Sequence, residues 1–236
     1  MISVFVDARC LQDADYNFRG IGYHVASLLR GKAHSDARSW RSIALVDSHL
    51  PALPRDYAAL FSEVSLAWNP VLPPSGSVFL SASPMTHGPV KSLRFTGRGT
   101  ALYAAAVVYD FIPLEREGYL SSVHTRIDYF SKLARLKHFD MYLPLSKHAG
   151  NKLQELLGIS QQSIVVTGGC VRSSLYGHSR RSLKRLEPYV LTVGGSDRRK
   201  NTEVVVRAVS AIRQEKEHSL RLKIVGTYGE AYKSEL

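Results

Sequence analysis

The sequence predicts an α/β fold, a doubly wound parallel sheet followed by the first β-α-β segment of a second domain. The apolar segment Ile2–Val6 leads into a glycine-bearing loop and then an amphipathic segment, which is how such a sheet begins. Short apolar segments and amphipathic segments then alternate along the chain. The same strand-turn-helix pattern starts again at Tyr189, which indicates a second domain.

The strands of the first domain are expected where short, strongly apolar segments occur between turn-forming residues. These segments are Ile2–Val6, Ser42–Val46, Val78–Ser81, Ala101–Asp110, Asp140–Leu145 and Ile164–Thr167. A polar loop is expected between Asp7 and Gly20, and another at Ser83–Pro89 beyond the carboxyl end of a strand.

The helices are predicted from apolar residues that recur at helical spacing. The first begins near Gly20, with Ile21, Val25, Leu28 and Leu29 on one face. A second is expected over His124–Lys137, with Ile127, Phe130, Leu133 and Ala134 facing inward. A third follows Ser146, a favourable N-cap, and ends at Gly158.

Composition limits the classes of protein that this chain can belong to. Its 236 residues allow one large or two smaller domains, and 44% hydrophobic with 22% charged residues suits a globular protein with a sizeable core. No apolar run is long enough to span a membrane, and the N-terminus lacks the features of a signal peptide. Cys10 and Cys170 lie far apart, with no C-x-x-C or Cys/His spacing typical of a zinc site or a disulfide framework, so reduced thiols in a cytoplasm are expected.

The stretch Tyr189–Asn201 carries the clearest binding signal. An apolar strand leads into Gly194 and Gly195, and then into Arg198, Arg199 and Lys200 just before a predicted helix. Cations are unfavourable at a helix N-terminus, by roughly 0.3–1 kcal/mol each. They are explained if an anion binds between them and the free N–H groups of the helix. A solvated basic turn is the alternative.

Other candidate sites carry weaker signals. Gly20 and Gly22 meet part of a dinucleotide fingerprint, but Val25 occupies the third glycine position, which argues against NAD. Asp13-Ala14-Asp15 has the spelling of a metal-binding motif but lies in the first loop, and we interpret it as solvated. Asp110 follows the most apolar strand, at the edge of the sheet where ligands bind. The alternative, which this position taken alone favours, is that Asp110 caps the following turn.

The domain organisation follows from these patterns. Residues 1–170 form the first domain, residues 171–188 a basic linker without clean periodicity, and residues 189–236 the start of a second domain. This last segment is too short to build an independent core, so the second domain is expected to be incomplete.

Five segments occur together, in this order, and resemble a known family. They are D-A-R-C-L-Q (Asp7–Gln12), R-G-I-G-Y-H-V (Arg19–Val25), V-Y-D-F-I-P-L (Val108–Leu114), L-P-L-S-K-H-A-G-N-K-L-Q-E-L-L-G (Leu143–Gly158) and Y-V-L-T-V-G-G-S-D-R-R-K-N (Tyr189–Asn201). Together they resemble the nucleotide-sugar glycosyltransferases of family 4, which have the GT-B architecture of two facing Rossmann-like domains. The resemblance extends over the whole chain.

The resemblance implies a retaining transfer of a sugar, with a mannose-type donor favoured, from a nucleoside-diphosphate sugar. The acceptor would be a saccharide or lipid-linked molecule held by the first domain, as in polysaccharide biosynthesis. Arg199 and Lys200 match the pair that contacts the leaving diphosphate, so neither a metal nor another cofactor is expected. Gly20 matches a loop glycine that approaches the donor, and Asp110 a position, often His, that faces the donor sugar. Gly195 falls where relatives often carry Arg, so Arg198 would replace that contact.

One departure from the family is large. Relatives carry a Glu-x7-Glu segment that holds the donor's ribose and sugar, and no such segment follows the linker here. The 236-residue chain alone is therefore expected to transfer little or no sugar, and a non-catalytic remnant acting as a binding module is a second reading. A nucleic-acid-binding protein is a third, but no RNP, zinc-finger or helix-turn-helix signature is present.

The excess of positive charge suggests an anionic partner. The chain carries a net charge of +11. Between Val171 and Lys200 the sequence has eight cations (Arg172, Arg180, Arg181, Lys184, Arg185, Arg198, Arg199, Lys200) against Glu187 and Asp197, a net of 8 − 2 = +6. Basic segments attract anionic bilayers, so a cytoplasmic protein with peripheral contact at the inner face of the membrane is expected. A solvated linker is the alternative.

Overall fold

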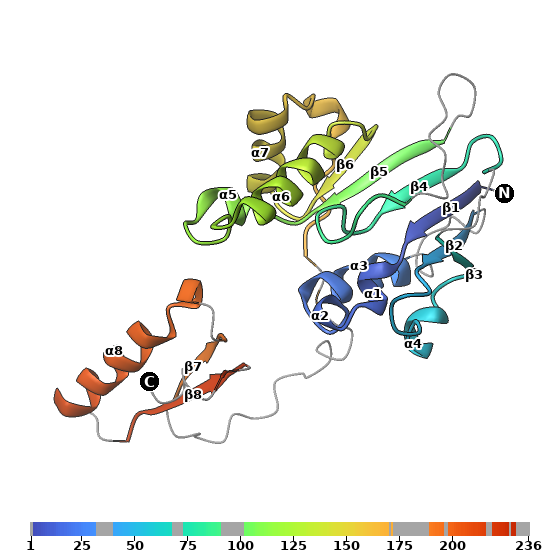
Figure 1. Ribbon diagram of the computed structural model, residues 1–236. Helices are drawn as coiled ribbons and strands as arrows, with labels where there is room; N and C mark the ends of the chain where they lie inside the picture. Colours follow the sequence, from blue (N-terminus) through green and yellow to red (C-terminus); the bar gives the residue numbers. More distant parts are fainter. Residues whose placement is uncertain are drawn as a thin grey trace. The chain divides into compact units, whose positions relative to one another are not determined.

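The chain divides into two compact units, Met1–Ser173 and Ser174–Leu236, and each is described by itself (Figure 1). The computed structural model describes residues 2–31, 40–67, 73–90, 102–169, 171, 189–195, 198–215, 219–226 and 228–229. Apart from Val171, the basic linker predicted over residues 171–188 lies outside the described residues. The predicted linker and its boundaries therefore stay predictions.

The first unit is built on a six-stranded sheet in the order β3-β2-β1-β4-β5-β6, and every neighbouring pair is parallel. The strands are β1 (Ile2–Asp7), β2 (Trp40–Val46), β3 (Glu63–Leu66), β4 (Val78–Ser81), β5 (Tyr103–Val108) and β6 (Met141–Pro144). This strand order is that of a doubly wound, Rossmann-like sheet. The predicted α/β fold class is confirmed for this unit.

Helices pack on this sheet through separate apolar clusters. They are α1 (Arg9–Gln12), α2 (Ala14–Asn17), α3 (Gly20–Gly31), α4 (Arg55–Ala58), α5 (Ile112–Glu115), α6 (Val123–Leu136) and α7 (Lys147–Leu157), with a 3₁₀ turn η2 at Gln161–Ser163. Because strand side chains alternate between faces, Val6 joins the cluster with α1 and α3 while Phe5 joins a cluster on the opposite face. A third cluster joins β5 and β6 to α6 and α7, and Figure 1 shows these two helices beside the two strands.

Helix α7 confirms the predicted capping signals. The Ser146 hydroxyl accepts a hydrogen bond from the backbone N–H of Ala149, and Gly158 ends the helix with φ 67°. A left-handed residue here favours glycine because a Cβ would clash in that conformation. Leu153 of this helix is fully buried.

The inward face predicted for α6 is correct at Leu133 and wrong at its other three positions. Ile127 and Phe130 are 63% and 49% exposed, and Ala134 is exposed too. The helix buries Leu133, as predicted, together with Leu136 against the cluster of β5 and β6. Apolar residues occupy two stripes on this helix, and spacing alone does not say which stripe meets the sheet.

Two smaller predictions also need correction. The predicted strand Ile164–Thr167 forms only an isolated parallel bridge between Tyr142 and Ile164. The backbone N–H groups of Val165 and Thr167 still bond carbonyls of β6, at 2.9 and 3.0 Å. The predicted polar loop between Asp7 and Gly20 contains the short helices α1 and α2, and every residue of α1 is buried.

The second unit contains a parallel pair of strands and one long helix. Strand β7 (Tyr189–Val193) pairs with β8 (Arg221–Val225), and between them lie the 3₁₀ turn η4 (Arg198–Lys200) and helix α8 (Thr202–Glu215). Among the described residues of the unit, only Thr202 and Val209 are buried. The β-α-β segment is present as predicted, and its membership of a larger second domain stays a prediction. No helix within the described ranges of the chain combines the length and apolarity needed to cross a membrane.

Candidate functional site

The strand order creates a switch point in the first unit. The chain runs from β1 outward through β2 and β3, and then returns to the other side of β1 with β4. Asp7 and Ser81, the last residues of β1 and β4, lie side by side in the register. In open parallel sheets ligands bind outside the carboxyl ends of strands at such a point, so the loops after β1 and β4 form the candidate site.

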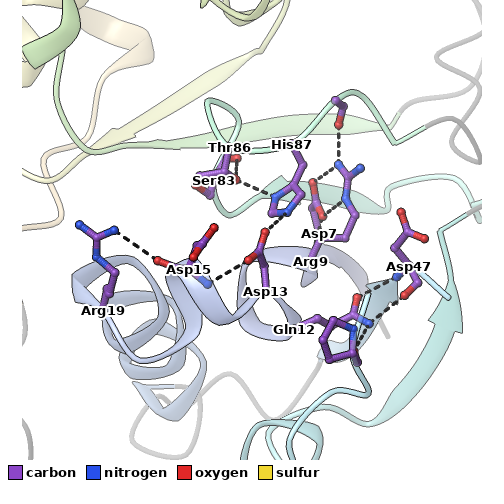
Figure 2. Close-up of polar contacts among 12 residues, drawn as sticks. Asp7, Arg9, Gln12, Asp13, Asp15, Arg19, Asp47, Ser83, Thr86 and His87 are labelled. Atoms are coloured by element: carbon purple, nitrogen blue, oxygen red, sulfur yellow. Dashed lines mark hydrogen bonds and ion pairs between the residues drawn. The ribbon is translucent and has the colours of Figure 1, made fainter. Parts of the chain in front are cut away.

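A buried ion pair lies at this edge. Arg9 Nε donates to Asp7 Oδ1 at 2.8 Å, and Arg9 Nη2 donates to Asp7 Oδ2 at 2.7 Å. The two side chains are only 5% and 7% exposed. Arg9 Nη2 also donates to the carbonyl oxygen of Gly88 at 2.5 Å. The pair therefore ties the loop after β4 to the end of β1 (Figure 2).

A second polar cluster joins the same two loops. His87 Nε2 lies 3.1 Å from Asp13 Oδ2, and His87 Nδ1 lies 2.8 Å from the hydroxyl of Thr86. In a neutral ring protonated on Nε2, Nε2–H donates to Asp13. The Thr86 hydroxyl also donates to the Ser83 carbonyl at 2.9 Å, so its single proton is shared between that carbonyl and Nδ1 of His87. Figure 2 shows His87 above Asp13, beside the Asp7–Arg9 pair.

The environment of His87 favours this neutral ring. Burial lowers its pKa most, and the Arg9 guanidinium lowers it further, while the carboxylates of Asp7 and Asp13 act in the opposite direction. The net shift is downward. The ring of Tyr16 contacts the imidazole edge-on, with centroids 5.8 Å apart. At neutral pH the His87 ring is therefore uncharged and is fixed by its hydrogen bonds. It is not a free cation.

The predicted residues of the first unit lie near this edge but are not bonded into it. Asp110 follows β5, is exposed, and accepts a hydrogen bond from the backbone N–H of Ile112 at 3.2 Å. It therefore caps the following turn, which was the alternative reading of its position. Gly20 is the first residue of α3, and a Cβ added there would meet open space. The space beside Gly20 is therefore open to a ligand.

The other predicted residues gather at the turn between β7 and α8. Gly194 donates its backbone N–H to the Val225 carbonyl at 2.8 Å, and a Cβ there would clash with the hydroxyl of Tyr228. Arg199 and Lys200 are exposed on η4. Gly195 is half-buried, and the side chain of Arg198 lies outside what the structure describes. The turn thus presents two cations at the entry of a 14-residue helix.

Asn201 reinforces this geometry. Its φ of 53° is a left-handed conformation, one that most side chains avoid. The next residue, Thr202, is fully buried, and its hydroxyl lies 3.4 Å from that of Tyr228. Thr202, the buried first residue of α8, and the left-handed Asn201 before it therefore fix the end of η4 next to the start of α8.

Sequence reasoning missed Arg9, Asp13 and His87 as site residues. Asp13 was interpreted as part of a solvated motif, yet its side chain is only 24% exposed and it also accepts from the Asp15 backbone N–H. The sequence signal that could have identified these three residues is that polar residues follow both β1 and β4. Their proximity becomes visible only once these strands are known to be neighbours. Within the described part of the chain, no group of three or more His, Cys, Asp or Glu side chains could hold a metal ion.

Comparison with known proteins gave no further assignment. A scan against protein-family models found no match, and a search of curated proteins also found none.

Proposed function

We propose that the chain is a retaining glycosyltransferase, or the N-terminal part of one, that uses a nucleoside-diphosphate sugar. The observation that carries the proposal is the turn between β7 and α8. There two exposed cations, Arg199 and Lys200, precede a long helix, and the space beside Gly194 is filled by the hydroxyls of Tyr228 and Thr202. In the transfer reaction negative charge develops on the leaving diphosphate, and prepositioned cations together with a helix N-terminus stabilise it.

Each of the proposed site residues has a role toward the sugar donor. Arg199 and Lys200 bind the diphosphate, so no metal is required, and Gly195 leaves room for the donor with Arg198 as an additional contact. In the first unit Asp110 accepts a hydrogen bond from the sugar, and Gly20 allows close approach of the loop. A mannose-type donor and a saccharide or lipid-linked acceptor remain the favoured substrates.

The proposal is tested by titrating the 236-residue chain with GDP and UDP and following backbone amide shifts. We expect the largest shifts at Gly194, Gly195 and Thr202, and we expect Lys200→Ala to abolish them. Transfer from nucleotide sugars is then measured with the intact gene product. Saturating nucleotide that shifts none of these amides would refute the proposed donor site. Binding without transfer by the intact product would favour the non-catalytic binding module.

Peripheral membrane contact is proposed on charge alone. The basic segment Val171–Lys200 carries a net charge of +6, eight cations against two acids. Near an anionic surface each charge contributes about 1 kcal/mol. We expect the chain to sediment with vesicles containing anionic lipid and to be released by salt. Equal sedimentation with purely neutral vesicles would contradict an electrostatic contact.

A further inference from the structure

A pocket of about 280 Å³ opens in the first unit beside the Asp7–Arg9 pair. It lies between β4 and β5 on one side and the last turns of α6 on the other. Its floor is apolar: Phe79, Ala104 and Leu136 line it, and all three are buried. Such a floor favours a small apolar group over water.

The charged groups around the pocket are mostly neutralised by their neighbours. Asp7 is held bidentately by Arg9, and His87 lies against Asp13. Lys132 Nζ bonds Asp128 Oδ2 at 2.7 Å and the Thr86 carbonyl at 3.2 Å. None of these groups leaves a free charge directed at a ligand.

Arg135 differs from them. Its half-buried side chain lines the pocket, yet within the residues that the structure describes its guanidinium has no hydrogen bond and no ion pair. A guanidinium presents parallel N–H groups that match a carboxylate or a phosphate. The pocket therefore combines an apolar floor with one uncompensated cation.

We propose that this pocket binds a small amphiphilic anion, a single apolar ring or short chain bearing one phosphate or carboxylate group. The apolar part lies over Phe79, Ala104 and Leu136, and the anionic group pairs with Arg135. The volume is just below the range of about 300–1,000 Å³ that is usual for drug-sized ligands, which favours one ring over a whole nucleotide sugar. The assignment uses only the first unit and stands whether or not the transferase proposal holds.

The test is calorimetric titration of the 236-residue chain with phenyl phosphate, benzoate, phenol and inorganic phosphate. We expect saturable one-to-one binding of phenyl phosphate or benzoate, and much weaker binding of phenol and of inorganic phosphate. Amide shifts on Ala104 and Leu136 locate the ligand. Tighter binding of phenyl phosphate than of benzoate assigns the anionic group as phosphate, and the reverse order assigns it as carboxylate.

The variant Arg135→Gln removes the positive charge of the proposed site and leaves the apolar residues of the pocket floor unchanged. A hydrogen bond to a charged group is worth about 1.5–3 kcal/mol, so the affinity for the anionic ligand should fall roughly tenfold or more while phenol binding is unchanged. Lys137→Gln is the matched control, because Lys137 is exposed and adjoins the same helix end. Circular dichroism confirms that both variants fold. Equal losses in the two variants, equal affinity for inorganic phosphate and phenyl phosphate, or no saturable binding would overturn the proposal.

Discussion

Arg9 and Asp7 form a bidentate ion pair that is nearly closed to solvent, and the same guanidinium holds the carbonyl of Gly88. Removing one partner of such a pair leaves a buried charge, which costs about 3–5 kcal/mol. We therefore expect Arg9→Met to lower the free energy of unfolding by about that amount. The measurement is urea denaturation followed by circular dichroism.

The double variant Asp7→Asn/Arg9→Met is the control for this first prediction. It removes both charges, so it should be more stable than Arg9→Met alone. A single variant that loses less than about 1 kcal/mol would mean that water reaches the Asp7 carboxylate, as it does in exposed pairs.

Two neighbouring glycines of α3 should respond in opposite ways to alanine. A Cβ at Gly22 would lie 2.6 Å from the Asn17 carbonyl carbon, whereas a Cβ at Gly20 meets nothing. Gly22→Ala should therefore destabilise the protein, because a backbone clash outweighs the gain in helix propensity. Gly20→Ala should be neutral or stabilising by up to about 1 kcal/mol.

Thermal unfolding of the two variants checks this pair. The Gly20→Ala variant also distinguishes an effect on stability from an effect on activity. We expect the intact gene product with this change to keep its stability and lose transfer activity, because Gly20 is proposed to let its loop approach the donor closely. If Gly22→Ala were as stable as Gly20→Ala, α2 and α3 would not be packed as described.

His24 should make stability depend on pH. Its Nε2 lies 3.1 Å from the Gly168 carbonyl, and its buried Nδ1 has no hydrogen-bond partner among the residues that the structure describes. Burial lowers the pKa of His24 below 6.5, and the bond to Gly168 only partly opposes this. The folded state therefore keeps the ring neutral while the unfolded chain binds a proton. Stability is complete above pH 6.5 and declines as the pH falls toward the folded-state pKa, by at most about 1.4 kcal/mol per pH unit.

Urea unfolding at several pH values between 5 and 8 measures this slope. His24→Gln keeps a donor for Gly168 and removes the titrating group, so the slope should become shallower. His124→Gln, at an exposed position of α6, is the control and should leave it unchanged. Because the pKa of His87 is lowered too, part of the slope should persist. An unchanged slope in His24→Gln would show that His24 does not contribute.

Lys200→Ala tests the proposed diphosphate contact. Lys200 is exposed on η4, so its removal should hardly change the free energy of unfolding. In the intact gene product it should lower kcat by roughly a hundredfold to a thousandfold, the range seen when one transition-state stabiliser is lost. Arg213→Ala, in the last turn of α8, removes an exposed cation far along the same helix and should leave kcat unchanged. Full turnover in Lys200→Ala would exclude the contact.

Local signals in the sequence predicted local structure well. Ser146 and Gly158 act within one helix, and both were correctly assigned. Ile127 and Phe130 were not, because the face that α6 buries depends on where the sheet lies, and periodicity within the helix carries no such information. The short helices α1 and α2 were missed for a related reason: four-residue helices depend on tertiary packing more than on propensity.

The candidate site was predicted less completely than the fold. Asp13 and His87 are 74 positions apart in the sequence, and only the return of the chain to β4 brings them together. The glycines and cations between β7 and α8 were found because they are contiguous. A contiguous motif is visible in a sequence, whereas a site assembled from two loops depends on strand order.

The bond between Arg9 and Gly88, which spans 79 positions, also has a consequence for how the chain folds during synthesis. Strand β1 can pair with β2 as soon as both have emerged, but its other edge must wait for β4. Until then an unpaired strand edge is exposed, which is the feature that promotes wrong pairing between chains. Closing so long a loop is also slow compared with forming local contacts. Ribosome-stalled chains that end before β4 should therefore be prone to aggregate, and the Asp7–Arg9 cluster should form only after residue 88 has left the ribosome.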